Sequence, residues 1–194
     1  MTYRKLFFLA FLCPLVACSA KPNLYLLESA PAGKQLSTVA TLIEVSQIDL
    51  PQYVQASELL LRSEDGVVRT QKNDLWADAP GRALTEILAR ALDETLSADV
   101  AAEPWPFDVP ADLRVTVKVH QMIGTAGQEL RFSGQYFLGA SSASDLAIAN
   151  RFDFSVPLKD TSLQVLSSAH TQAISRLADQ IATNISKLRT AQLF

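Results

Sequence analysis

Leu113-Arg114-Val115-Thr116-Val117-Lys118-Val119-His120 carries the clearest secondary-structure signal in the chain. Apolar residues occupy every second position, and polar or charged residues lie between them. Successive side chains of a strand point to opposite faces, so this period of two predicts a strand with one buried and one polar face.

Two more strands are predicted after this one. The second has apolar residues on one face and the third alternates aromatic or branched residues with polar ones, at Leu130, Phe132, Tyr136 and Leu138 and at Phe152, Phe154 and Val156. Short links between three consecutive strands predict an antiparallel meander. The small polar stretch Ala140–Ser144 is expected to form a flexible hairpin tip.

Two amphipathic helices flank the meander. The first is predicted from Asp78, as the cap, to near Ser97, and the second from about Ser167 to Arg189. Their apolar residues recur at helical spacing: Leu84, Ile87, Leu88, Ala91, Leu92 and Leu96 in the first, and Ala173, Ile174, Leu177, Ile181, Ile185 and Leu188 in the second. Such a stripe buries one face of a helix against a core.

Shorter strands are expected before the first helix. Tyr25–Leu27 is a predicted strand, and Asp65-Gly66 predicts a hairpin between two further apolar runs. The alternation over Val39–Ser46 predicts another strand, which is expected to end at Asp49-Leu50-Pro51. Ala101–Pro110 contains three prolines and is predicted to be a loop. Together these elements predict a single α+β domain, with an antiparallel-rich sheet and two amphipathic helices packed on one face.

The first 18 residues have the pattern of a bacterial export signal. Arg4-Lys5 precedes an apolar run that ends in Leu15-Val16-Ala17-Cys18. These four residues resemble the lipobox of bacterial lipoproteins, in which the cysteine receives a diacylglycerol and its new amine an acyl chain such as palmitate. The resemblance implies that Cys18 is lipidated. The alternative is a plain signal peptide or a membrane helix, but the run is shorter than the ~20 apolar residues that span a bilayer.

Processing before Cys18 defines the predicted domains: a removed signal peptide at 1–17, a lipidated tether at 18–24, and a domain at 25–194. The mature chain would keep 177 of the 194 residues, with 15 basic and 20 acidic side chains and a net charge of −5. An acidic chain without a basic cluster argues against nucleic-acid binding. Cys13 leaves with the signal, so no internal disulfide is expected.

Ser19 follows the predicted lipidated cysteine. In Gram-negative lipoproteins, which these features resemble, serine at this position usually permits transfer to the outer membrane, whereas aspartate tends to retain the protein at the inner membrane. The resemblance implies an outer-membrane anchor facing the periplasm. A Gram-positive surface lipoprotein is the alternative.

No motif of an enzyme or metal site is present. His120 lies on the polar face of a predicted strand and His170 near the start of a helix, and neither has a metal-binding spacing. The sequence also lacks a nucleophile elbow and a phosphate-binding loop. We therefore expect no catalytic residue, no metal and no cofactor other than the acyl groups on Cys18.

A family resemblance extends over nearly the whole mature chain. It begins at Ile48-Asp49-Leu50-Pro51-Gln52-Tyr53, continues through Glu58–Arg62 and Asn73–Asp78, and includes the leucine-striped helix. These stretches resemble the ABC-type transport auxiliary lipoprotein family, also described as PqiC/YmbA-like. The family often has Trp-Ala-Glu-Pro-Leu where this chain has Trp76-Ala77-Asp78-Ala79-Pro80, so the proline is displaced by one position.

The resemblance implies a non-enzymatic role at the outer membrane. Family members work with MCE-domain (mammalian cell entry) proteins of the inner membrane, which form rings or tubes that carry lipids across the periplasm, and some auxiliary members assemble as homo-oligomeric rings. The resemblance thus predicts a docking adaptor in an MCE-protein, ABC-type lipid transport system. The alternatives are a periplasmic lipid-binding module and a structural envelope lipoprotein.

Five residues are candidates for contact with a partner or another subunit: Asp49, Pro51, Tyr53, Trp76 and Trp105. Tryptophan and tyrosine bury a large area at low cost in side-chain entropy, which suits an interface. Each also has a structural interpretation, because Pro51 and Tyr53 could end a strand and fill a gap, and Trp76 could pack in the core. Trp105 lies in the proline-rich loop, where side chains often face outward.

Overall fold

The computed structural model describes residues 21–28, 35–140 and 147–193. The predicted signal peptide at 1–17, the predicted lipidation site Cys18 and most of the predicted hairpin tip at 140–144 lie outside these residues.

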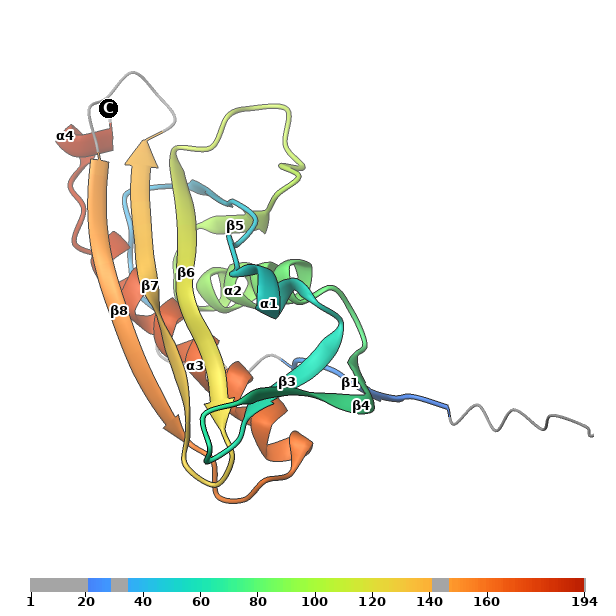
Figure 1. Ribbon diagram of the computed structural model, residues 1–194. Coiled ribbons are helices and arrows are strands. Elements are labelled where there is room, and N and C mark those ends of the chain that lie inside the picture. Colours follow the sequence, from blue (N-terminus) through green and yellow to red (C-terminus); the bar gives the residue numbers. More distant parts are fainter. Residues whose placement is uncertain (1–20, 29–34, 141–146, 194) are drawn as a thin grey trace, which may run out of the picture.

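The described chain contains eight strands and four helices, and its last four strands follow one another without a helix between them (Figure 1). The strands are β1 (Asn23–Tyr25), β2 (Leu42–Val45), β3 (Glu58–Arg62), β4 (Val68–Trp76), β5 (Asp99–Ala102), β6 (Leu113–Thr125), β7 (Glu129–Ala140) and β8 (Ala147–Pro157). The helices are α1 (Gln52–Gln55), α2 (Pro80–Thr95), α3 (Leu163–Ile185) and α4 (Thr190–Leu193).

Strand β6 lies in the middle of one mixed sheet. On one side it pairs antiparallel with β7, which pairs antiparallel with β8, so the predicted meander is confirmed. On its other side, β6 pairs in parallel with β2 near its start and with β3 near its end. The sheet continues from β2 to β5, and from β3 through β4 to β1. The β2–β5 pair and the β3–β4–β1 group thus form two short parts of the sheet. Between them, the middle of β6 has no described strand beside it on this side.

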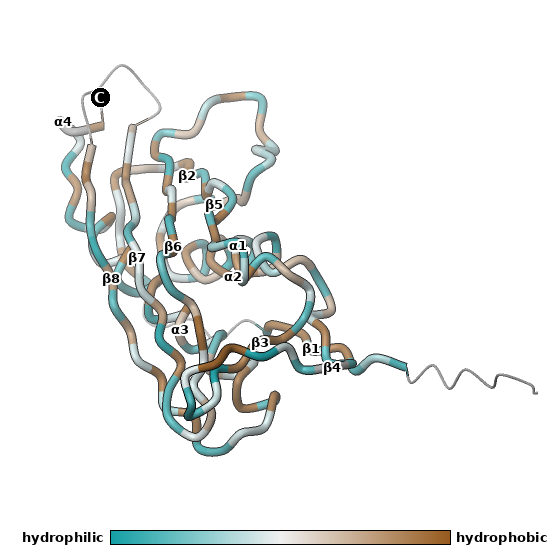
Figure 2. Tube along the Cα trace, viewed as in Figure 1, coloured by the Kyte–Doolittle hydropathy of each residue, from teal (hydrophilic) through white to brown (hydrophobic). Residues whose placement is uncertain are grey.

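The two long helices cover one face of the sheet (Figure 1). Helix α2 packs against β2, β5 and α3, and α3 packs against β7 and β8. The single α+β domain with two amphipathic helices is therefore confirmed. Figure 2 shows hydrophilic and hydrophobic residues alternating along β6, β7 and β8, as expected for strands with one covered and one open face.

The core lies between the sheet and the two long helices, and its aromatic part is on β7 and β8. Phe132 and Tyr136 of β7 are fully buried, and the ring centroid of Phe132 is 4.8 Å from that of Phe152 on β8. Gly134 of β7 lies between Phe132 and Tyr136 and leaves no room for a side chain, because an added Cβ would lie 2.2 Å from the Lys118 carbonyl oxygen. The same Cβ would lie 2.8 Å from the Phe152 ring, so the absence of a side chain at Gly134 lets this ring lie over β7.

Both long helices begin differently from the prediction. Ala79, not Asp78, is the N-cap of α2, and Asp78 instead forms an ion pair with Arg82. Helix α3 begins at Leu163, four residues before Ser167, because the Ser162 hydroxyl caps its first turn by accepting from the Val165 N–H at 3.4 Å.

Two predicted boundaries in the strands also differ. Strand β2 covers Leu42–Val45 of the predicted Val39–Ser46, because the Asp112 carboxylate accepts from the Thr41 and Leu42 N–H groups at 2.8 and 3.0 Å. Burial alone would raise the pKa of Asp112, but hydrogen bonds from the Thr41 hydroxyl and from these two N–H groups outweigh it and lower that pKa. Ala101 and Ala102, predicted as loop, belong to β5 through its parallel pairing with β2.

Candidate functional site

Asp49 lies along the middle of β6, between the places where β2 and β3 pair with that strand. The Asp49 N–H donates to the Val117 carbonyl at 3.0 Å, and the Asp49 carbonyl accepts from the Val119 N–H at 2.9 Å. Its carboxylate lies 3.6 Å from the ammonium of Lys118, and both side chains are more than half exposed. An exposed pair of this kind adds little stability, so the backbone bonds are the main link of Asp49 to the sheet.

Tyr53 meets β6 at an irregular point of its ladder. The register between β6 and β7 shifts between Val119 and Gln121, which leaves Met122 beside a β-bulge. The Tyr53 hydroxyl accepts from the Met122 N–H at 3.1 Å, while 39% of the tyrosine stays exposed. Pro51 precedes α1, the short helix that carries Tyr53. Tyr53 thus satisfies a backbone donor and still offers part of its ring to solvent.

Trp76 ends β4 and is only 9% exposed. Its ring meets that of His170 on α3 edge to face, with the centroids 5.2 Å apart and the planes at 71°. The Leu166 carbonyl lies 2.8 Å from Nδ1 of His170 and can only accept, so Nδ1 carries the proton of a neutral imidazole. Burial lowers the pKa of His170 to about 4, against the opposing effect of that hydrogen bond.

Tyr53 and Trp76 are brought together around one small inner cavity. His170 and Glu58 line it as well, and its volume is about 20 Å³. This is about the room that one water molecule needs, and far less than a lipid acyl chain requires. The side chains at this point of the core therefore pack against one another, and Trp76 serves the fold here. Whether Trp76 also contacts a partner stays a prediction.

Trp105 belongs to the loop between β5 and β6, and no residue of this loop lines the cavity at Tyr53 and Trp76. Its indole N–H donates to the Val109 carbonyl at 2.7 Å, and its ring centroid is 4.9 Å from that of Phe107. Phe107 and Val109 are both exposed. Trp105 thus closes the loop, and the loop presents Phe107 and Val109 to solvent. Neither residue was among the candidates predicted from the sequence.

A wider groove lies on the other side of Trp76. It runs between Tyr25–Glu28 and the first turns of α2, and its volume is about 720 Å³. Its lining is mixed, with Leu27 and Ile87 beside charged side chains such as Arg90. Glu28, which lines the groove, is the last residue described before the interruption at 29–34.

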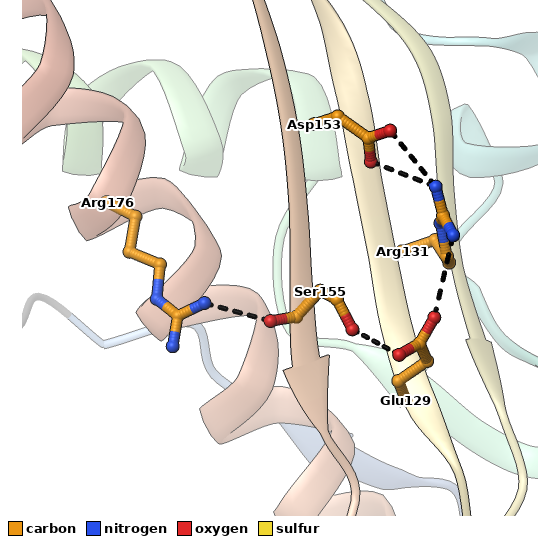
Figure 3. Close-up of polar contacts among 5 residues, drawn as sticks. All are labelled: Glu129, Arg131, Asp153, Ser155 and Arg176. Atoms are coloured by element: carbon orange, nitrogen blue, oxygen red, sulfur yellow. Dashed lines mark hydrogen bonds and ion pairs between the residues drawn. The ribbon is translucent and has the colours of Figure 1, made fainter.

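The open face of the sheet carries a network of exposed polar groups (Figure 3). Arg131 of β7 donates to both carboxylate oxygens of Asp153 at 3.1 and 3.0 Å and lies 3.7 Å from Glu129. The Ser155 hydroxyl bonds to Glu129, and the Arg176 guanidinium of α3 donates to the Ser155 carbonyl at 2.8 Å. These contacts tie β7, β8 and α3 together across the end of the sheet.

The same helix protects the edge of β8. Besides Arg176, Gln180 of α3 donates to the Arg151 carbonyl at 3.0 Å. Strand β8 pairs with β7 on one side, so these carbonyls face its open edge. Side chains that occupy such acceptors make an edge less available to an added strand.

Two kinds of feature are absent from the described residues. Within 21–28, 35–140 and 147–193, no cluster of three or more His, Cys, Asp or Glu side chains could hold a metal ion. No helix in the same part of the chain is both long and apolar enough to cross a membrane.

Solved structures with the same fold are known. An uncharacterized protein superposes with a TM-score of 0.67 at 17% identity, over 86% of this chain and 99% of that chain. A Xanthomonas campestris protein of the family DUF330 gives 0.65 at 15% identity, over 84% and 94%. A PelC dodecamer from Paraburkholderia phytofirmans is more distant, at 0.44 and 16% identity, over 77% and 92%.

The sequence comparison is more specific than the fold. Among curated proteins, no relative matches the chain. A family model described as "ABC-type transport auxiliary lipoprotein component" matches residues 25–182, which includes β2 to β8, the last residue of β1 and nearly all of α3. The chain therefore belongs to the ABC-type transport auxiliary lipoprotein family.

Proposed function

We propose that this protein is a non-enzymatic outer-membrane lipoprotein that docks an MCE-protein, ABC-type lipid transport system on the periplasmic face of the outer membrane. The observation that carries the proposal is the family match over residues 25–182, which follows a lipobox-like Leu15–Cys18. The family supplies the role of a transport auxiliary component. The lipobox supplies an anchor for it.

The physical need for such a protein follows from the hydrophobic effect. Moving a lipid between two membranes through water exposes its acyl chains, at ~0.8 kcal/mol for each CH₂ group. A protein tube avoids this cost only if its far end is held at the receiving membrane. A single acyl chain binds a membrane only marginally, whereas the diacylglycerol and N-acyl chain proposed on Cys18 would hold the adaptor firmly.

The contact surface for the partner is proposed to include Tyr53 and the loop of Trp105. Tyr53 is exposed over 39% of its surface, and the Trp105 loop presents Phe107 and Val109 to solvent. Aromatic and apolar side chains on a rigid support suit the centre of an interface. Asp49, Pro51 and Trp76 are proposed to support this surface from beneath or beside it.

Copurification from membranes tests the docking role. Wild-type protein and Cys18→Ala would be purified from membranes solubilised in mild detergent, and mass spectrometry would identify both the modification of Cys18 and the proteins that copurify. An acylated Cys18 with an MCE protein and an ABC transporter is the expected result. An acylated protein that carries phospholipid and no MCE protein would favour the lipid-binding alternative. Other envelope proteins in its place would favour a structural role.

Site-specific crosslinking then tests the surface. A photo-reactive phenylalanine analogue would replace Phe107 in one variant and Tyr53 in another, with Val67 of the distant β3–β4 hairpin as the matched exposed control. Crosslinks to the MCE protein from Phe107 or Tyr53, and none from Val67, are expected. Crosslinks from Val67 alone would place the interface elsewhere.

A further inference from the structure

Two leucines at the start of the described chain face solvent. The exposed fraction is 63% for Leu24 and 65% for Leu26, the largest values among the exposed large hydrophobic residues of the described chain. Tyr25 and Leu27, which alternate with them, pack against the core. Alternation along an extended segment places Leu24 and Leu26 on the same side, opposite Tyr25 and Leu27. Leu26 lies at the rim of the groove between this segment and α2, and most of its surface stays open to solvent.

The exposure of these leucines is built into the fold. Strand β1 pairs in parallel with β4 at the end of the sheet, with Leu24 opposite Leu75 (Figure 1). The Ser167 hydroxyl of α3 donates to the Leu26 carbonyl at 2.8 Å. Hydrogen bonds on both sides of the segment therefore fix its direction, so the two side chains are presented outward by a supported strand.

The length of the chain before β1 limits where the leucines can be. Five residues lie between Cys18 and Leu24, so Leu24 is six positions after the cysteine. A fully extended chain covers at most ~3.6 Å per position, so the two residues lie within about 22 Å of each other. If Cys18 carries acyl chains in a membrane, Leu24 lies close to the lipid surface whatever path the tether takes.

We propose that Leu24 and Leu26 enter the phospholipid leaflet beside the acyl chains of Cys18, so that β1 sets the orientation of the domain on the membrane. This inference rests on the proposed anchor at Cys18. The lipid surface is the apolar phase that the short tether brings within reach. Lys21, exposed between anchor and strand, suits the level of the anionic phosphates.

The anchor and the leucines would have separate effects. The acyl chains determine how firmly the protein binds, whereas the leucines determine which face of the domain turns toward the bilayer. A Leu24→Ser, Leu26→Ser double variant is therefore expected to bind membranes as firmly as wild type, while losing its fixed orientation.

Fluorescent labels report the environment of each leucine. The mature chain has no cysteine besides Cys18, so Leu24→Cys or Leu26→Cys adds one free thiol for an environment-sensitive dye. The full-length acylated protein would be reconstituted into vesicles of phosphatidylethanolamine and phosphatidylglycerol, with and without doxyl-labelled lipid as a quencher. Val68→Cys, an exposed apolar position on the β3–β4 hairpin, is the matched control.

The expected result is a rise of roughly threefold in dye emission at positions 24 and 26 on transfer to the apolar phase, followed by quenching by doxyl lipid, and neither effect at position 68. Labels at 24 and 26 that stay as exposed as the control would overturn the inference. A rise that doxyl lipid does not quench would also overturn it, because protein rather than lipid would then cover the leucines.

Flotation of the vesicles separates this inference from the function on which it rests. Protein that floats with exposed labels at 24 and 26 overturns the leaflet contact alone and leaves the anchor intact. Protein that carries no acyl chain and does not float overturns both the anchor and the leaflet contact. The double serine variant should float like wild type, and polarised infrared spectra of aligned bilayers should show a broader distribution of helix tilt for it.

Discussion

Acidification should destabilise this protein through His170. The ring is buried against Trp76, and its pKa is lowered from the ordinary 6.5 to about 4, chiefly by burial. Between these two values the unfolded chain binds a proton that the folded chain does not. Stability is therefore fully present above pH 6.5 and falls as the pH drops toward 4, below which this contribution no longer changes.

The size of the effect follows from the two pKa values. A difference of one pKa unit corresponds to 1.36 kcal/mol, so His170 should contribute a loss of about 3 kcal/mol between pH 7 and pH 4. The other titratable groups at its cavity are Tyr53 and Glu58, and Glu58 is exposed. Asp112 and Asp160 have pKa values below the ordinary 3.8. Their contributions to stability are lost only as the pH falls below about 4, which is below the range in which His170 acts.

Chemical unfolding at a series of pH values measures this loss. The mature chain without acyl groups would be unfolded by urea and followed by circular dichroism, as wild type, His170→Gln and His120→Gln. Glutamine cannot take up a proton here, so His170→Gln should lose much less stability between pH 7 and pH 4. His120 is exposed, so His120→Gln should follow wild type. Equal losses in wild type and His170→Gln would refute the assignment, as would an NMR titration of His170 near pH 6.5.

Four structural substitutions should have graded effects on the free energy of unfolding, measured with urea. Gly134→Ala places a Cβ against the Lys118 carbonyl and should cost more than about 3 kcal/mol, whereas Gly66→Ala, at a φ of +81° in open space, should cost about 1 kcal/mol. Tyr53→Phe leaves the Met122 N–H without its acceptor and should cost about 1 kcal/mol. Phe132→Ala opens a cavity in the core and should cost about 3–5 kcal/mol. A smaller loss for Gly134→Ala than for Gly66→Ala would contradict the close approach at Gly134.

Local periodicity predicted the meander and both long helices because each of these elements buries a continuous stripe of its own. Residues 113–120 lie within β6, and the leucine stripe of α2 faces the sheet as expected. Local periodicity could not predict the parallel pairings of the short strands. Strand β1 pairs with β4 across about fifty residues of sequence, and β2 pairs with β5 at a similar separation. An alternating pattern shows that a strand has a buried face, but it does not name the neighbouring strand.

The candidate residues illustrate the same limit on a smaller scale. Trp76 and Trp105 are the same residue type, yet one packs on His170 in the core and the other closes a surface loop. Each flanking sequence contains prolines or small residues, so local composition does not separate the two environments. Tyr53 bonds to Met122, which lies 69 positions away, and no local pattern indicates that contact.

These contacts change how a partner surface should be sought. Tyr53 accepts a hydrogen bond from the backbone of β6, and Trp76 packs in the core. Substituting either residue therefore disturbs the fold as well as any interface. A loss of partner binding in such variants would have two explanations. An exposed side chain outside the core separates the two explanations, and Phe107 is one, because it is exposed and contacts Trp105 within a surface loop. A Phe107→Ser variant that keeps the unfolding free energy of wild type and loses the MCE protein would place the interface at this loop. The same variant with undiminished binding would leave Tyr53 as the proposed contact.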